Sequence, residues 1–101
     1  LSNETEALKG KAVSPPYLIY FYRSDCPDCA EIEHVVVAPH EHEFGPEFLV
    51  RIDVSKTRGS QSQMQLMEYL GVSLTIQAPV LVYDSHAFSG RDDIANRFGR
   101  R

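Results

Sequence analysis

The residues of this chain best suited to covalent chemistry are its two cysteines, Cys26 and Cys29, which lie three positions apart. Pro27 follows the first cysteine, and proline is favoured at the first position of a helix, so the pair is expected at a helix start. Side chains at i and i+3 share one side of a helical turn, which brings the two Cα atoms close to the separation of a disulfide. The pair can therefore switch between dithiol and disulfide with little backbone movement.

The two cysteines are predicted to have different environments. Cys26 stands where the helix cap would be, beside unpaired N–H groups and the positive end of the helix dipole, and both lower the pKa of a thiol. Cys29 lies inside the helix, at helical spacing with Ile32 and Val36, and is expected to be more buried. We therefore expect Cys26 to attack a substrate disulfide and Cys29 to resolve the mixed disulfide that results.

Two other uses of a Cys-x-x-Cys pair remain open. The pair is also half of a zinc site, and the other ligands would then come from His34, His40, His42 or His86. It can also be a structural staple, although so short a loop constrains little chain entropy. The redox interpretation is favoured because the pair follows a run of strand-forming residues and opens a helix inside a strand–helix–strand pattern. Neither a metal nor a cofactor is predicted.

Hydrophobic periodicity and helix breakers predict the elements that position the cysteines. Residues 2–12 are expected to form a short helix, which the prolines at 15–16 end. The uninterrupted apolar run 17–22 predicts a strand that is buried on both faces and hence central in a sheet. The motif helix is expected over residues 26–38, where the next residue, a proline, would stop it. Residues 40–47 are expected to form a polar, acidic loop.

An edge strand and a third helix are predicted next. Residues 48–54 alternate apolar and charged side chains, which suits a strand with one exposed face, where Arg51 would pair with Asp53. Ser60 or Ser62 would cap a helix that the following glycine, Gly71, stops. The side chains expected to face inward from this helix, at three-residue spacing, are Met64, Met67 and Leu70.

The C-terminal part is predicted to close the sheet. A loop over residues 72–78 leads to Pro79 and to a second uninterrupted apolar strand, 80–83. A tight turn lets a short strand at 87–88 return antiparallel, and Ser89 would cap a final short helix. The fold class is therefore α/β, a central mixed sheet of about four strands flanked by helices.

The order of these elements and motifs resembles the thioredoxin-like superfamily. The resemblance covers roughly residues 14–98, and it implies a thioredoxin fold and thiol–disulfide exchange. It also implies that Pro79 is cis and faces the cysteines, and that the Ala78 backbone pairs with an extended substrate peptide. The segments that carry it are a strand before Cys26-Pro27-Asp28-Cys29, a strand that ends at Asp53, and Gly71-Val72 followed by Ala78-Pro79-Val80-Leu81-Val82.

This resemblance implies substrate contacts and partners. Pro27 and Asp28, between the cysteines, are expected to contact the substrate together with Ala78 and Pro79. The implied partners are a disulfide-containing protein substrate and a thiol or disulfide redox partner. A second hypothesis is a redox-inactive or metal-binding thioredoxin-like module, which would bind a partner peptide at the Ala78-Pro79 loop.

The sequence departs from thioredoxin itself at three positions near the motif. Asp25 replaces the tryptophan that usually precedes the first cysteine, and His34 replaces the proline that kinks the motif helix. Tyr20 stands where thioredoxin keeps a buried acid, and it is expected to serve in packing. These changes favour a compact bacterial thioredoxin-like protein over thioredoxin itself.

Acidic residues around the motif bear on the direction of electron flow. Four carboxylates surround the cysteines in sequence: Asp25, Asp28, Glu31 and Glu33. Negative charge opposes a neighbouring thiolate and raises its pKa, whereas the helix terminus and Arg23 act in the opposite direction. A strong oxidant needs a very stable thiolate, so we expect a reductase- or isomerase-like exchanger. Asp25 and His34 are the side chains expected to tune the pKa values of the cysteines.

Length and composition limit the functions further. The 101 residues suit one domain over 1–101, with an N-terminal helical segment over 1–13 and a frayed tail over 99–101. Ten Lys and Arg against 14 Asp and Glu give a net charge of −4, which argues against nucleic acid as the main partner. No apolar run approaches the roughly 18–20 residues of a membrane span. The chain begins with Leu1, which permits removal of an export segment, so a bacterial extracytoplasmic location is expected, with the cytoplasm as the alternative.

Overall fold

The computed structural model describes residues 2–98, and the predicted tail over residues 99–101 lies outside that range. No helix within this range is long and apolar enough to cross a membrane. The elements in chain order are α1 (Ser2–Ala12), β1 (Leu18–Tyr22), α2 (Pro27–Ile32), the π-helix η1 (Glu33–Val37), α3 (Ala38–Phe44), the 3₁₀ turn η2 (Pro46–Phe48), β2 (Leu49–Asp53), α4 (Thr57–Leu70), β3 (Val80–Tyr83), β4 (His86–Ser89) and α5 (Arg91–Phe98).

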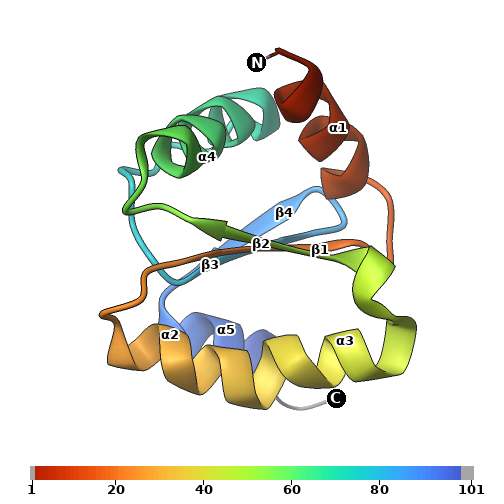
Figure 1. Ribbon diagram of the computed structural model, residues 1–101, viewed down its shortest axis with the longest axis vertical. Coiled ribbons are helices and arrows are strands. Elements are labelled where there is room, and N and C mark those ends of the chain that lie inside the picture. Colours follow the sequence, from red (N-terminus) through yellow and green to blue (C-terminus); the bar gives the residue numbers. More distant parts are fainter. Residues whose placement is uncertain (1, 99–101) are drawn as a thin grey trace.

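The strands form a four-stranded mixed sheet in the order β2-β1-β3-β4. β1 pairs parallel with β2 and antiparallel with β3, and β3 pairs antiparallel with β4. Figure 1 shows α1 and α4 covering one face of the sheet and α2, α3 and α5 covering the other. The α/β class, the two central strands and the edge position of β2 were all predicted from the sequence, and the structure confirms them.

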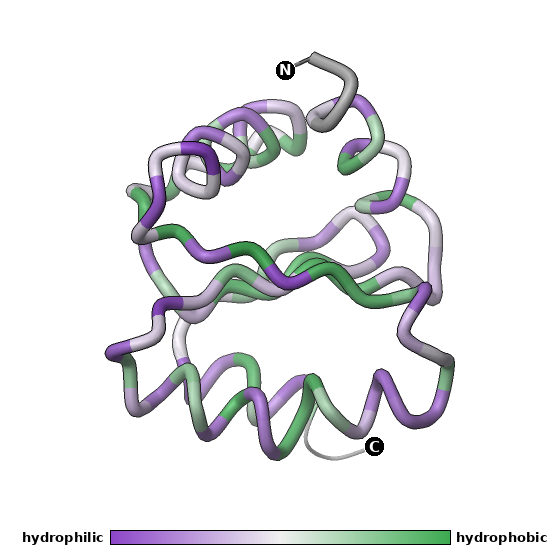
Figure 2. Tube along the Cα trace, viewed as in Figure 1, coloured by the Kyte–Doolittle hydropathy of each residue, from purple (hydrophilic) through white to green (hydrophobic). Residues whose placement is uncertain are grey.

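The core lies on both faces of the sheet, because side chains along a strand point alternately to opposite faces. Figure 2 shows hydrophobic residues concentrated along the strands, between two layers of helices with hydrophilic outer sides. Ile19 and Phe21 of β1 pack toward α1 and α4, whereas Leu18 and Tyr20 pack toward α2 and α5. The helix that carries the cysteines is therefore held against a buried central strand.

The motif helix does not end before Pro39, so that prediction was wrong. α2 passes into the π-helix η1, in which the N–H of Ala38 donates to the carbonyl of Glu33, five residues back. The hydrogen-bond pattern is thus already offset when Pro39 is reached. Pro39 takes an early position in α3, where the missing N–H of proline removes no helical hydrogen bond.

The acidic loop expected over residues 40–47 is also wrong, because most of this segment is helical. α3 runs to Phe44, and η2 follows it directly before β2. His40 faces inward and is buried, and its Nε2 lies 2.7 Å from the carbonyl oxygen of Pro16. Val36, His40 and Phe44 recur every four residues, and this helical spacing was overlooked among the charged residues between them.

The start of α4 differs from the prediction. The helix begins at Thr57 rather than at a cap on Ser60 or Ser62, and Lys56 occupies the cap position in an extended conformation. Gly59 lies in the first turn, where an added Cβ would overlap the carbonyl oxygen of Asp53. The absence of a side chain at this position lets α4 approach the end of β2 closely.

The buried face of α4 also differs in part. Met67 is buried and Leu70 half-buried as predicted, but the side chain of Met64 is exposed, at 56%. A helix turns by about 100° per residue, so positions three apart drift around it by about 60° at each step. The face that packs on the sheet follows i, i+3, i+4, i+7 instead, through Gln63, Leu66, Met67 and Leu70.

Candidate active site

The two cysteines form a disulfide at the start of α2. Cys26 is the cap residue in an extended conformation, and its Sγ accepts a hydrogen bond of 3.0 Å from the N–H of Cys29. The two Cα atoms are 5.1 Å apart. Cys29 is buried, with 3% of its surface exposed, whereas Cys26 is half-buried. The unequal burial predicted from the sequence is therefore present, and Sγ of Cys26 already receives a helix N–H donor.

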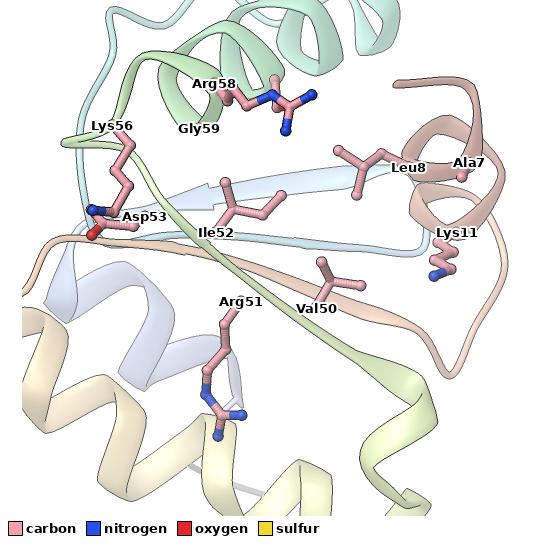
Figure 3. Close-up of a pocket in the computed structure, with 11 residues that line it drawn as sticks. Ala7, Leu8, Lys11, Val50, Arg51, Ile52, Asp53, Lys56, Arg58 and Gly59 are labelled. Atoms are coloured by element: carbon pink, nitrogen blue, oxygen red, sulfur yellow. The ribbon is translucent and has the colours of Figure 1, made fainter. Parts of the chain in front are cut away.

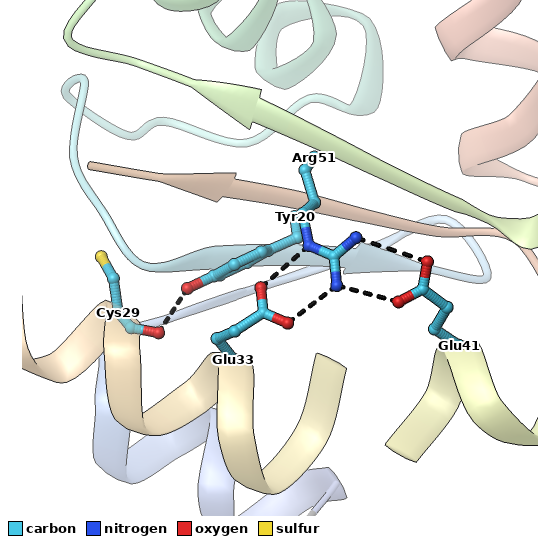
Figure 4. A network of polar contacts seen from close by, with 5 residues as sticks. All are labelled: Tyr20, Cys29, Glu33, Glu41 and Arg51. Carbon is cyan, nitrogen blue, oxygen red and sulfur yellow. Dashed lines mark hydrogen bonds and ion pairs between the residues drawn. The ribbon is translucent and has the colours of Figure 1, made fainter. Parts of the chain in front are cut away.

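Tyr20 connects the central strand to the second cysteine. Its side chain is 1% exposed, and its hydroxyl donates a hydrogen bond of 2.6 Å to the carbonyl oxygen of Cys29 (Figure 4). Burial, with a further contribution from the nearby negative charge of Glu33, raises the pKa of the Tyr20 phenol. The hydroxyl therefore remains a neutral donor over the whole physiological range. The sequence predicted only packing here, because the hydrogen bond depends on the height of α2 above the sheet.

Arg51 lies beside Tyr20 and joins β2 to the motif helix (Figure 4). Its Nε and Nη2 donate to the two carboxylate oxygens of Glu33 at 2.9 and 2.7 Å, and Nη2 also reaches Glu41 at 3.1 Å. The hydrogen bonds to Glu33 and then to Glu41 raise the pKa of Arg51, so this side chain stays charged. The network ties the edge strand to η1 and α3.

The predicted pair between Arg51 and Asp53 is therefore wrong. The carboxylate of Asp53 instead accepts hydrogen bonds from the hydroxyl and the backbone N–H of Ser55, at 2.7 and 2.9 Å, and these bonds lower the pKa of Asp53. Arg51 finds more favourable partners on the helices because two carboxylates converge on its planar guanidinium.

A second arginine, Arg91 of α5, reaches α2 from the other side. Its Nη1 lies 3.2 Å from a carboxylate oxygen of Glu31, and its Nε lies 3.9 Å from one of Asp28. Nη2 pairs with Asp92 at 3.0 Å. The hydrogen bond to Glu31 is the largest cause of a raised pKa at Arg91. No feature of the sequence indicated this contact, because 60 residues separate Arg91 from Glu31.

The loop before β3 is fixed beside the cysteines. The Ala78–Pro79 peptide bond is cis, and Ala78 packs against the same buried cluster as Cys26 and Cys29. The carbonyl oxygen of Pro79 accepts a hydrogen bond of 3.0 Å from the N–H of Gly90, at the start of α5. The loop and the cysteines therefore share one buried cluster, and β3 begins opposite the end of β1, the strand that leads to Cys26.

Two glutamines that the sequence reasoning overlooked hold this loop in place. The buried amide of Gln63 donates to the carbonyl of Gln77 at 2.8 Å and accepts from its N–H at 3.1 Å. The hydroxyl of Ser89 donates to the Gln77 side chain at 2.7 Å, so Ser89 does not cap α5 as predicted. The sequence held one signal of these contacts. Gln63 is a polar residue on the apolar face of a predicted helix, and a buried amide needs hydrogen-bond partners.

The remaining predicted site residues lie on the surface. Pro27 and Asp28 are exposed in the first turn of α2, and Asp25 is exposed just before it. His34 is exposed on η1 and forms no hydrogen bond or ion pair within residues 2–98. The structure therefore brings Pro27 and Asp28 to the cysteines and leaves His34 one turn farther along the helix.

The histidines considered as zinc ligands do not converge. His40 faces the interior and His42 is exposed on the same helix, α3. Two positions apart on a helix point to nearly opposite sides, so these imidazoles do not chelate one ion. Among the described residues, no three His, Cys, Asp or Glu side chains are grouped to hold a metal ion.

A hollow of about 430 Å³ lies on the opposite face of the sheet, between α1, β2 and α4. Val50 and Ile52 form its floor, and Leu8 and Arg58 stand on its walls (Figure 3). Arg51 borders it through its backbone, while its guanidinium points to the other face. The sheet separates this hollow from the cysteines, so it is not part of their site.

Comparisons with known proteins identify the fold. The sequence matches no protein-family model, and no curated protein is significantly similar to it. Oxidized glutaredoxin 2 from Chlamydomonas reinhardtii superposes with a TM-score of 0.56 at 14% identity, over 94% of this chain and 81% of that one.

Two plant structures give similar values. A buckwheat glutaredoxin–glutathione complex has a TM-score of 0.56 at 16% identity, over 95% of this chain and 79% of that one. A wheat glutaredoxin has a TM-score of 0.53 at 22% identity, over 95% of this chain and 84% of that one. The chain therefore has the thioredoxin-like fold, as the resemblance in its sequence implied.

Proposed function

We propose that this chain carries out thiol–disulfide exchange on protein substrates through Cys26 and Cys29. The observation that supports the proposal most directly is the disulfide between a half-exposed helix cap and a buried residue one turn later. A structural staple would have no need for one accessible sulfur. The thioredoxin-like fold, shared with glutaredoxins, is a second support.

The exchange proceeds in two steps that balance electrons and protons. The thiolate of reduced Cys26 attacks one sulfur of the substrate disulfide, and the other substrate sulfur leaves as a thiolate that takes up a proton. Cys29 loses its proton and attacks Sγ of Cys26, which releases the second substrate thiol. The substrate gains two electrons, and the chain is left with the Cys26–Cys29 disulfide.

The Ala78–Pro79 loop is the proposed substrate contact. Ala78 packs against the buried cluster that contains Cys29, and we expect an extended peptide that pairs with the Ala78 backbone to bring its disulfide to Sγ of Cys26. Pro27 and Asp28, which are exposed in the first turn of α2, would contact the same peptide. Recognition of the main chain would make the site tolerant of different substrate sequences.

We propose a reductase- or isomerase-like direction. Asp25 is exposed directly before Cys26 and forms no ion pair within residues 2–98, so it disfavours the thiolate. The structure balances this effect with the helix N–H donor at Cys26 and with arginines near the other carboxylates. A chain of this kind needs a thiol reductant, and glutathione is a candidate because one similar structure is a glutathione complex.

Single cysteine variants test the proposal. The reduced protein, Cys26→Ser and Cys29→Ser would each be mixed with a disulfide-bonded protein, and the products separated under non-reducing conditions. We expect Cys29→Ser to accumulate a covalent mixed disulfide and Cys26→Ser to form none. Equal trapping by both variants, or by neither, would contradict the assigned roles.

The same experiment addresses the alternative module that binds a peptide or a metal without redox chemistry. Such a module would retain a partner through the Ala78-Pro79 loop in both variants and would transfer no electrons. Turnover assayed with glutathione and, side by side, with a dithiol shows whether glutathione is the preferred reductant.

A further inference from the structure

We infer that Arg91 is a positioning residue of the exchange site, whose guanidinium compensates the carboxylates of α2 and so stabilises the thiolate form of Cys26. This inference rests on the proposed function, and it concerns the charge at the attacking sulfur. It adds a cation to the two groups, the helix terminus and Arg23, that the sequence set against the carboxylates around the motif.

The backbone places Arg91 beside the cysteines. Gly90 adopts a φ of +88°, a conformation that favours glycine, and its N–H donates to the carbonyl of Pro79 at 3.0 Å. Its own carbonyl accepts from the N–H of Ile94 and begins α5. Arg91 is thus the first residue of α5, directly after Gly90, which is hydrogen-bonded to the Ala78–Pro79 loop.

The side chain of Arg91 extends from this junction to the first two turns of α2. It meets Glu31 at 3.2 Å and Asp28 at 3.9 Å, and Asp28 is two residues after Cys26. Arg91 is 42% exposed, so water screens each pair and the separate contributions are small. Removal of the guanidinium would nevertheless leave the two carboxylates of α2, the helix that Cys26 caps, with no cation held to them.

The other groups that face this end of α2 are few. Asp25 and Arg23, in the preceding turn, are exposed and carry opposite charges. Glu33 is held by Arg51 on the far side of the helix, and the titratable side chains of β1 are the phenols of Tyr20 and Tyr22. Asp92 pairs with Arg91 itself. Among the described residues, Arg91 is therefore the cation that forms ion pairs with the carboxylates of α2.

A compensating charge of this kind has a distinctive thermodynamic signature. The disulfide and the neutral dithiol carry no charge on sulfur, so Arg91 affects neither directly. Only the thiolate responds to the guanidinium. Loss of Arg91 should therefore leave the reduction potential unchanged at low pH and lower it above the pKa of Cys26, where the reduced form is a thiolate.

The experiment compares Arg91→Gln with Arg97→Gln, which removes the same charge from the same helix. Arg97 pairs with Asp93 within α5, at 3.6 Å, and lies over the Phe88 ring, away from α2. Cys26 pKa values would be measured from pH-dependent alkylation rates, and reduction potentials from equilibration with thiol buffers at several pH values. Thermal unfolding would confirm that all variants fold.

We expect Arg91→Gln to lower the acid dissociation constant of Cys26 by about threefold, a magnitude typical of partly exposed charge pairs. The reduction potential should then fall by about 14 mV above that pKa, because a tenfold change in an equilibrium constant corresponds to 29.6 mV in a two-electron couple. Arg91→Lys should restore part of the wild-type pKa of Cys26, and Arg97→Gln should leave that pKa unchanged. The pKa difference between the wild type and Arg91→Gln should shrink in high salt.

Two outcomes would overturn the inference: equal Cys26 pKa values in Arg91→Gln and Arg97→Gln, or a potential shift that is the same at low and high pH. Failure of the proposed function gives a different pattern. The wild type would then exchange no substrate disulfide, while alkylation of Cys26 would still report the effect of Arg91 on its pKa.

Discussion

At the scale of single residues, the site depends on hydrogen bonds and ion pairs that join distant parts of the chain. The hydroxyl of Tyr20 binds the carbonyl of Cys29, and Arg51 and Arg91 bind carboxylates of the motif helix. Spacing within the sequence identified the cysteines and their unequal burial. It could not identify these partners, because the contacts depend on how the helices pack on the sheet and on one another.

Tyr20→Phe tests the shortest of these contacts, at 2.6 Å. The substitution keeps the ring and removes the buried donor to Cys29, whose carbonyl retains its helical hydrogen bond from the N–H of Glu33. We expect the free energy of unfolding of the oxidised protein to fall by about 1–2 kcal/mol, measured in urea at pH 7. Tyr22→Phe, at a half-buried neighbour on the same strand, is the matched control and should change it by less than about 0.5 kcal/mol.

The pH dependence of this difference follows from the raised pKa of Tyr20. In the unfolded chain the phenol ionises near its ordinary value of 10.0, whereas burial keeps it neutral in the folded protein at that pH. The stabilisation is therefore complete below pH 10 and is lost as the pH rises further. The wild type and Tyr20→Phe should converge in stability above pH 10, and a difference that stays constant to pH 11 would show that the hydroxyl is not buried as described.

At the scale of elements, the existence and order of the strands and helices could be predicted, and their ends and faces only in part. Strands β1 and β3 are uninterrupted apolar runs, so their central position could be predicted from the sequence. The π-helix η1 could not be predicted, because its offset hydrogen bonds have no sequence signature. The same offset lets the helix continue through Pro39. Met64 was misplaced because spacing of three alone does not define one helix face.

The close approach of α4 to β2 gives a prediction at this scale. Gly59→Ala would place a Cβ against the carbonyl oxygen of Asp53, so we expect a loss of at least about 2 kcal/mol in stability. Gly10→Ala is the matched control, since nothing lies within 4 Å of a Cβ added there and the residue is in α1. That variant should gain about 0.5–1 kcal/mol from helix propensity. Urea unfolding of both variants gives the comparison, and similar stabilities would contradict the packing of α4.

At the scale of the whole molecule, the fold brings three separate segments to the start of α2. These are the motif itself, the Ala78–Pro79 loop and the β4–α5 junction, which carries Gly90 and Arg91. The thioredoxin-like fold was predicted from the motifs and their order, and the glutaredoxin structures confirm it. The balance of charge around Cys26 could not be predicted, because two of the four carboxylates near the motif are paired with an arginine of α5.

The most direct test of the redox account is the reduction potential of the Cys26–Cys29 pair in the wild type. Reduced and oxidised thiol buffers would set the poise, and alkylation followed by mass spectrometry would count the free thiols at each point. We expect one two-electron transition at pH 7, below about −220 mV, as for a reductase-type exchanger. A transition above about −150 mV would reverse the proposed direction, and the absence of an intramolecular disulfide at every poise would contradict the redox function itself.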